Sequence, residues 1–536
     1  MAGLARLSTS HNVVTNAKGD AFMRRPGCRT LILGFTFCLA VGLATVVSAR
    51  AAQARPNPAA LAEDLDSLLA RADLGKTVVA ACVLDLGEPE GPARPRTVYS
   101  RLPDRPLIPA SNMKLMVTAA CFDRLGPDWR IRTHVGRVPS PRGKGRWDLA
   151  VIGGGDPNVS GRFWGGDTVG AFRRWAEVLK QRGVTAVERI VLDATLFDDT
   201  LVHPNWPADQ RHKWYEAPVN ALPINDNCVD VHVAPGPVGG AARVWLAPPG
   251  AGIGLTGRIR TAASKKAHRF SLQRFVDPDG SMRIHADGAC WAEAPERVVH
   301  RTLVDPTRVF GGALAHTLRA EGVRVAGPVV RAELTTPRGA ARRGFRCDVV
   351  HTSCLAATAA VTNTRSQGLY AECLFKLLGA YGQTPKVATP HPPRQGSWAS
   401  GRQELERWLA EAGIPAAGCV FDDGSGLSKK NRLTVFTLAR VLARMDRLYG
   451  ARFRETLAVA GDPRGTLRRR MRNTAAEGRI RAKTGYVAGA SALSGYAETD
   501  SGHRLAFAIL MNGFRRGHLW KARLAQDKMC IRLVQY

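Results

Sequence analysis

The chain has 536 residues, which is too long for one compact core, so two or three domains are expected. Hydrophobic residues make up 45% of it and charged residues 23%, a globular composition that excludes wholesale disorder. The formal net charge of +31 indicates a surface that attracts polyanions. Nucleic acid, anionic lipid and cell-wall carboxylates all fit that charge, so charge alone does not choose among them.

The first 54 residues have the order of an export signal. Arg24 and Arg25 precede the uncharged stretch 31–47, and Ala52-Gln53-Ala54 then offers a small-residue cleavage site. The stretch is long for a cleaved signal and near the lower limit for a spanning helix, so a cleaved signal peptide and a retained anchor both stay open. Met23 is an alternative start. We predict an exported, periplasmic or otherwise extracytoplasmic protein, which excludes nucleic acid as its partner.

The cysteines give no sign of a metal site. Of the 11 cysteines, two lie in the leader, and the other nine form no CxxC pair and have no histidine at metal-ligand spacing. We therefore predict neither a metal nor a cofactor. A disulfide is open in an exported protein, and Cys347 with Cys354 is one pairing that the sequence allows.

The first elements along the chain are a helix, a strand and a second helix. Leucines at 61, 65, 68 and 69 share one helical face, and the β-branched run 77–84 indicates a strand. The segment 109–120 has the pattern of a helix, and the Gly/Pro-rich stretch 139–145 marks a break. We place a domain boundary near residue 135.

The middle of the chain has the pattern of short strands and turns, with helices near 169–181 and 309–321, and ends in an Arg/Gly-rich linker at 337–346. The remaining segment returns to longer elements: helices at 367–378, 403–412 and 434–448, strands at 480–485, 491–497 and 505–511, and a last helix at 519–534. Strands near both ends with helices between them predict one α/β domain whose sheet uses both ends of the chain. The predicted division is a leader at 1–54, a first part of this domain at 55–135, a mostly β insertion at 136–345 and a second part at 346–536.

The first motif that carries chemistry is Ser111-Asn112-Met113-Lys114. A serine hydroxyl is a weak nucleophile until a base takes its proton. Positions i and i+3 share a helix face, so Lys114 can bring its amine to Ser111. The amine acts as a base only when its pKa is lowered, which burial achieves. Alone, the motif is common and usually marks a solvated helix face.

The second motif is Lys483-Thr484-Gly485, on a predicted strand and followed by Tyr486. Gly485 lets a ligand backbone approach the edge of a sheet. Lys483 and Thr484 can hold a carboxylate, the first as a charge and the second as a hydroxyl donor. Taken alone, this motif also describes an ordinary exposed lysine on an edge strand.

Together, SxxK near one end and KTG near the other are typical of penicillin-binding proteins and class A β-lactamases. From about residue 60 onward the chain resembles the D-alanyl-D-alanine carboxypeptidase/endopeptidase family of low-molecular-mass (class C) penicillin-binding proteins. Three further segments carry the resemblance: Gly153–Pro157, Ala221–Asn227 and Asp423–Ser428. The long gap between Ser111 and Ser366 fits this family better than a β-lactamase. The resemblance implies an α/β (α+β) transpeptidase fold, with an antiparallel sheet flanked by helices and a mostly β insertion.

The resemblance also implies roles for the residues. Ser111 attacks the carbonyl of a D-Ala-D-Xaa bond, Lys114 is the base, and Ser366 relays a proton to the leaving amine. Lys483 and Thr484 bind the terminal carboxylate, while the backbone N–H groups of Ser111 and Tyr486 form the oxyanion hole. The implied partners are peptidoglycan stem peptides, with β-lactam antibiotics as covalent inhibitors and a peripheral association with the envelope.

One position departs from the family pattern. Gly368 stands where the family has the asparagine of Ser-x-Asn. Losing one such polar contact costs about 1–3 kcal/mol, or roughly 10- to 100-fold in rate, so we expect a weakened rather than an inactive enzyme. Two alternatives remain: a catalytically impaired relative that only binds peptidoglycan, and a β-lactamase or esterase on the same scaffold.

Overall fold

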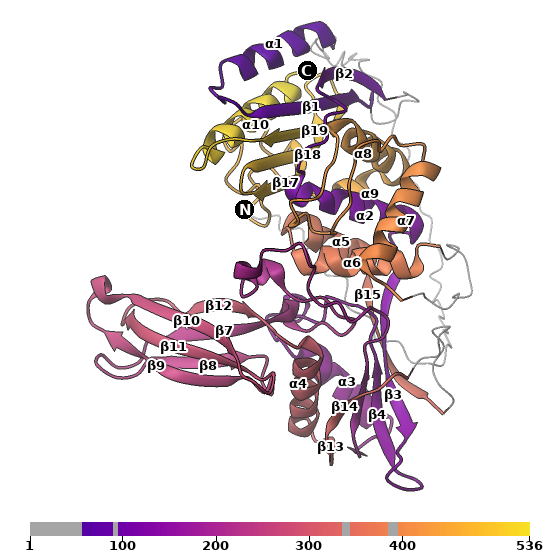
Figure 1. Ribbon diagram of the computed structural model, residues 1–536, viewed down its shortest axis with the longest axis vertical. Helices are drawn as coiled ribbons and strands as arrows, with labels where there is room; N and C mark the ends of the chain where they lie inside the picture. Colours follow the sequence, from indigo (N-terminus) through magenta and orange to yellow (C-terminus); the bar gives the residue numbers. More distant parts are fainter. Residues whose placement is uncertain (1–55, 89–94, 335–343, 384–394) are drawn as a thin grey trace, which may run out of the picture.

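The computed structural model describes residues 56–88, 95–334, 344–383 and 395–536. The predicted leader and most of the predicted linker at 337–346 lie outside the described residues. Figure 1 shows two parts of the molecule: an upper one built from both ends of the chain, and a lower one built from its middle. None of the helices in the described ranges is both long and apolar enough to cross a bilayer.

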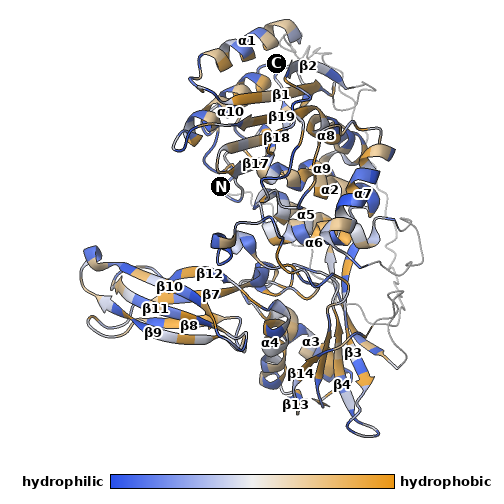
Figure 2. Cartoon of the chain, in the orientation of Figure 1, coloured by the Kyte–Doolittle hydropathy of each residue, from blue (hydrophilic) through white to orange (hydrophobic). Residues whose placement is uncertain are grey.

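The upper part contains a six-stranded antiparallel sheet that uses both ends of the chain. Its strands, in spatial order, are β16 (Ala458–Val459), β17 (Ile480–Val487), β18 (Ala490–Glu498), β19 (Arg504–Asn512), β1 (Val78–Asp85) and β2 (Arg96–Arg101). Strands β1, β18 and β19 are largely hydrophobic along their length (Figure 2), because helices cover both faces of the sheet.

Alternate residues of β1 face two different cores. Val79, Ala81 and Val83 belong to a core formed with α1 (Pro58–Ala70) and α10 (Leu519–Val534). The intervening residues 80, 82 and 84 belong to the opposite core. This two-residue period is that of a strand buried on both faces. The predicted antiparallel sheet flanked by helices is therefore present.

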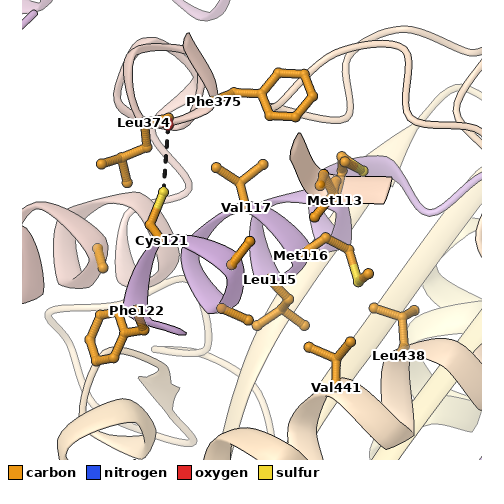
Figure 3. Packing of buried hydrophobic residues seen from close by; sticks show 14 of the residues in the cluster. Met113, Leu115, Met116, Val117, Cys121, Phe122, Leu374, Phe375, Leu438 and Val441 are labelled. Atoms are coloured by element: carbon orange, nitrogen blue, oxygen red, sulfur yellow. Dashed lines mark hydrogen bonds between the residues drawn. The ribbon is translucent and has the colours of Figure 1, made fainter. Parts of the chain in front are cut away.

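The second core surrounds α2 (Met113–Arg124), the helix that follows Ser111. In Figure 3 its side chains lie between those of two further helices, α6 (Gly368–Tyr381) and α8 (Val435–Tyr449). All but one of its residues are buried. The remaining helices of this part are α5 (Leu355–Thr364), α7 (Trp398–Glu411) and α9 (Ala451–Arg454). Burial on nearly every side fixes the direction in which this helix presents its N-terminus.

The lower part is mostly β, as expected. A five-stranded sheet runs in the order β14 (Val329–Arg331), β6 (Ile190–Asp193), β4 (Trp147–Ile152), β3 (Arg130–Pro139) and β15 (Arg346–Cys354). It shares a core with α3 (Gly170–Gln181) and α4 (Pro306–Ala320). Its smaller sheets contain β5 (Ala186–Val187) with β13 (Arg324–Val325), then β7 (Cys228–Ala234), β8 (Arg243–Ala247) and β12 (Arg297–Thr302), then β9 (Gly254–Ala262), β10 (Arg269–Val276) and β11 (Met282–Trp291).

The domain boundaries near 135 and 345 do not match the strand pairing. Residue 135 lies inside β3, and β15 pairs with β3 instead of joining the six-stranded sheet. The pattern of one strand does not reveal its pairing partner, so the sequence alone could not place these limits with respect to β3 and β15. We propose that the inserted region spans 130–354 and that the helical segments on either side of it belong to the upper part.

The structure contradicts the suggested disulfide between Cys347 and Cys354. All nine cysteines in the described part of the chain are free. Cys347 and Cys354 both lie on β15, seven residues apart. An extended strand separates such residues by roughly 23 Å, which is too far for a disulfide.

Candidate active site

Ser111 and Lys114 lie at the N-terminal end of α2. Ser111 is in a short 3₁₀ turn, η1 (Ala110–Asn112), and Lys114 is in the first turn of the helix. The Lys114 amine lies 3.2 Å from the Ser111 hydroxyl oxygen, within hydrogen-bonding distance. Ser111 is partly exposed, whereas Lys114 is only 2% exposed. The pair thus combines an accessible hydroxyl with a desolvated amine.

A strained turn presents Ser111. Ala110 has a φ of +45°, in the left-handed region that residues with a side chain rarely adopt. Gly426 makes room for this turn, since a Cβ at Gly426 would lie 1.8 Å from the Ala110 carbonyl oxygen. Strain of this kind persists only where surrounding structure holds it. The segment around Gly426 therefore fixes the nucleophile turn from the opposite side.

Burial gives the Lys114 amine the properties of a base. It lowers the pKa of Lys114 to about 8, against the opposing influence of Glu372 and Asp423. The amine also donates a 2.5 Å hydrogen bond to the Ser425 carbonyl oxygen. A pKa near 8 leaves part of the amine unprotonated at neutral pH, so it can take the proton of Ser111.

A buried glutamate, Glu372, holds the loop that contacts Lys114. Its carboxylate accepts hydrogen bonds from the backbone N–H groups of Gly424 (2.9 Å) and Ser425 (2.7 Å) and from the Trp398 indole (2.8 Å). Glu372 is fully buried, and burial together with the charge of Asp423 raises its pKa to about 7. The carboxylate therefore positions the Ser425 carbonyl and acts on the charge of Lys114.

Ser366 and Lys483 form the second half of the site. Ser366 lies between α5 and α6 with a φ of +60°, another strained non-glycine residue. The Lys483 amine donates to the Ser366 hydroxyl at 2.8 Å and to the Thr484 carbonyl at 2.7 Å. Burial, and then the charge of Lys114, lower the pKa of Lys483 well below its ordinary value. The two buried amines thus disfavour each other's protonation.

Strand β17 lies directly against the nucleophile turn. A Cβ at Gly485 would lie 2.8 Å from the Pro109 carbonyl oxygen and 3.1 Å from the Ser111 nitrogen, so glycine permits this close approach. The Asn112 side chain donates to the Lys483 carbonyl at 2.9 Å and joins the two elements. The Thr484 hydroxyl donates to the Thr466 hydroxyl at 3.0 Å. These contacts hold β17 at Gly485 beside Ser111.

A cavity opens beside Ser366. Its volume is about 630 Å³, and Arg365 and Gln367, which flank Ser366, are among its lining residues. Trp214, Asp230 and His300 from the inserted region line it as well. The inserted region therefore contributes directly to the surroundings of the site.

The comparisons with known proteins identify the family. The D-Ala-D-Ala carboxypeptidase 3 (S13) family model matches residues 61–532. The chain belongs to this family. It is 33% identical over 491 residues to a D-alanyl-D-alanine carboxypeptidase of Actinomadura sp. (strain R39), which covers 89% of this chain and 85% of the relative. It is also 22% identical over 438 residues to a penicillin-sensitive carboxypeptidase A of Dictyostelium discoideum, covering 75% of this chain and 77% of the relative.

The fold agrees with that assignment. A crystal structure of penicillin binding protein 4 from Haemophilus influenzae matches with a TM-score of 0.69 and 20% identity, covering 89% of this chain and 99% of that one. The predictions of family, fold class and enzyme class are therefore confirmed: the protein is a serine-type D-Ala-D-Ala carboxypeptidase. The non-catalytic binding module and the β-lactamase or esterase are not favoured.

Gly368 begins α6 in this carboxypeptidase and is buried next to Ser366. A Cβ at this position would lie 3.1 Å from the Tyr215 carbonyl oxygen and 3.9 Å from the Ser425 Cβ. A side chain here would thus need a small shift of the segment at Tyr215. The Ser425 carbonyl, which accepts from Lys114, supplies a polar contact near the place where the family asparagine would act.

Sequence reasoning missed three residues that this carboxypeptidase brings to the site: Glu372, Ser425 and Thr466. The signal for Glu372 is a charged residue within the apolar run of α6. Ser425 lies in a segment that carried the family resemblance, yet it has the composition of an ordinary turn. Nothing in the sequence pattern pointed to Thr466. Tyr486, by contrast, was named from its sequence position, and its side chain is 50% exposed with the Arg523 guanidinium 5.8 Å from its ring centre.

Proposed function

We propose that the protein hydrolyses D-Ala-D-Xaa bonds of peptidoglycan stem peptides through an acyl-enzyme on Ser111. The neutral Lys114 amine takes the hydroxyl proton of Ser111 as the oxygen attacks the carbonyl carbon. The C–N bond then breaks, the leaving amine gains a proton, and water later hydrolyses the ester. The observation that carries this proposal is the 3.2 Å contact between the Ser111 hydroxyl and a buried amine of lowered pKa.

The other half of the site handles the leaving group. The proton passes from Lys114 through Ser366, whose hydroxyl is already hydrogen-bonded to Lys483. Lys483 and Thr484 bind the carboxylate on the leaving side. An incoming carboxylate raises the pKa of Lys483 again, and the charge that Lys483 then holds favours the neutral form of Lys114. Substrate binding thereby favours the form of Lys114 that acts as the base.

Backbone groups stabilise the charge that develops on the carbonyl oxygen. The N–H groups of Ser111 and Tyr486 are the donors, because Gly485 allows β17 to reach the nucleophile turn. This assignment does not depend on the Tyr486 side chain. A β-lactam would acylate Ser111 in the same geometry, and one relative bears the name penicillin-sensitive carboxypeptidase A. The enzyme acts outside the cytoplasm, in peripheral association with the envelope.

Muropeptide analysis tests this function. Wild-type protein and Ser111→Ala are incubated with purified peptidoglycan, and the released products are identified by mass spectrometry. We expect the wild type to release D-alanine from pentapeptides, to split cross-linked dimers, or both, and Ser111→Ala to leave every muropeptide unchanged. Unchanged muropeptides in the wild type, with binding to peptidoglycan retained, would instead identify a non-catalytic binding protein.

A further inference from the structure

An arginine-rich segment lies beside the carboxylate-binding end of the site. It joins β16 to β17 and includes Arg468, Arg469 and Arg472, all three exposed. Its position is fixed at one end by Thr466, whose backbone N–H donates to the Thr364 carbonyl (3.1 Å) and whose hydroxyl accepts from Thr484. The three arginines therefore lie within six residues of Thr466, which contacts Thr484 of the KTG motif.

A second anchor holds the segment on α10. The Arg470 guanidinium donates to the Asp527 carboxylate at 2.8 Å and to the Arg523 carbonyl at 3.1 Å. Arg523 is itself exposed and lies over the Tyr486 ring. These contacts hold the segment against α10, next to Tyr486 of β17. We name Arg468, Arg469, Arg472 and Arg523 the arginine surface.

The four arginines of the arginine surface form no ion pair within the part of the chain that the structure describes, whereas the neighbouring Arg464 and Arg470 are paired with Asp462 and Asp527. Partial burial lowers the pKa of Arg523, and repulsion from the charge of Arg470 adds to this effect, whereas Asp527 opposes it. An anion placed on this surface would relieve that repulsion.

We propose that the arginine surface binds carboxylates of neighbouring stem peptides when the substrate is polymeric peptidoglycan. This inference rests on the proposed function and extends it from the scissile bond to the surrounding polymer. One carboxylate enters the pocket at Lys483 and Thr484. Further stems of the same polymer carry carboxylates of their own, and several exposed guanidinium groups spread over one surface suit such a repeating anion. The surface would raise the local concentration of scissile bonds without touching the reacting atoms.

A sedimentation assay with purified peptidoglycan tests the proposal. The full chain carrying Ser111→Ala is used, so that the polymer is not digested during the measurement. Adding Arg468→Gln, Arg469→Gln and Arg472→Gln should weaken binding about tenfold at low salt, and high salt should remove the difference, because contacts between exposed charges are screened. The matched control replaces three exposed arginines of the inserted region, Arg243, Arg258 and Arg269, by glutamine and should leave binding within about twofold.

Two further measurements identify the anion. The protein with all its arginines should bind peptidoglycan about tenfold more weakly once the carboxyl groups of the polymer have been converted to amides. Phosphatidylglycerol vesicles should not compete with peptidoglycan for the protein. Three results would each overturn the proposal. The triple variant could bind peptidoglycan as tightly as its parent, the protein could bind the amidated polymer as tightly as the untreated one, or the vesicles could compete effectively.

The outcome is separable from that of the proposed function. With Ser111 intact, the triple variant should hydrolyse a short soluble D-Ala-D-Ala peptide at a rate within about twofold of the wild type. A wild type that fails to hydrolyse this peptide contradicts the proposed function. If the wild type hydrolyses the peptide but the three substitutions leave peptidoglycan binding unaffected, only the proposed role of the arginine surface is contradicted.

Discussion

Replacing Lys114 by methionine is expected to lower the rate of acylation by a fluorescent penicillin about 10²- to 10⁴-fold, the range that a positioned general base contributes. Methionine fills a similar buried volume and leaves no charge, so the fold should persist. In the wild type, burial lowers the pKa of Lys114 to about 8. Below that pH the amine is protonated and cannot accept the Ser111 proton, so the wild-type rate should rise through pH 8 and then level off.

The Lys114→Met variant should be acylated slowly at every pH, and its rate should not increase as the pH rises. Stopped-flow labelling between pH 6 and 9.5 measures both. Lys266→Met, an exposed position on the inserted region, is the control and should keep the wild-type rate and profile. A Lys114→Met variant that is folded and acylates within tenfold of the wild type would show that another group is the base.

Replacing Glu372 by glutamine should move the rise of acylation to lower pH and reduce its plateau. An ionised carboxylate near Lys114 favours the charged amine, so removing it lowers the pKa of Lys114 further. Glutamine also cannot accept all three hydrogen bonds that Glu372 receives from Gly424, Ser425 and Trp398. The unsatisfied donor should destabilise the protein by about 1–3 kcal/mol and loosen the Ser425 loop, lowering the plateau roughly tenfold.

Glu404→Gln is the matched control, because Glu404 is another buried glutamate and forms ion pairs with Arg124 and Arg407 away from the site. It should reduce the free energy of unfolding without moving the pH profile. Urea denaturation and the pH dependence of acylation measure the two effects separately. A Glu372→Gln profile that coincides with that of the wild type would show that this carboxylate does not act on Lys114.

Local patterns predicted much of the fold. The last helix was expected at 519–534, and α10 has those limits, because its apolar positions repeat at the helical period and the polar residues His518 and Gln535 flank it. The strands near 491 and 505 were recognised from largely apolar runs that the structure buries on both faces, whereas β17, the strand near 480, is only partly buried. The pairing of β15 with β3 was not recognised, because each strand alone is compatible with either sheet.

In the candidate site, too, some residues could be predicted from the sequence and others could not. Spacing along one helix is enough to place Lys114 next to Ser111, and the family pattern added Ser366 and Lys483. Neither could reveal Glu372, whose effect depends on a loop more than 50 residues further along the chain. The pKa of Lys114 was beyond prediction as well, since it depends on how completely α6 and the Ser425 loop exclude water.

Peptide mapping of the penicillin-labelled protein tests most directly whether Ser111 is the nucleophile that Lys114 activates. The wild type is acylated, digested with a protease under acidic conditions, and the labelled peptide is sequenced by mass spectrometry. The adduct should lie on Ser111 alone and should be absent from Ser111→Ala. An adduct on Ser366 or Ser425, or equal labelling of Ser111→Ala, would contradict the assignment of the nucleophile.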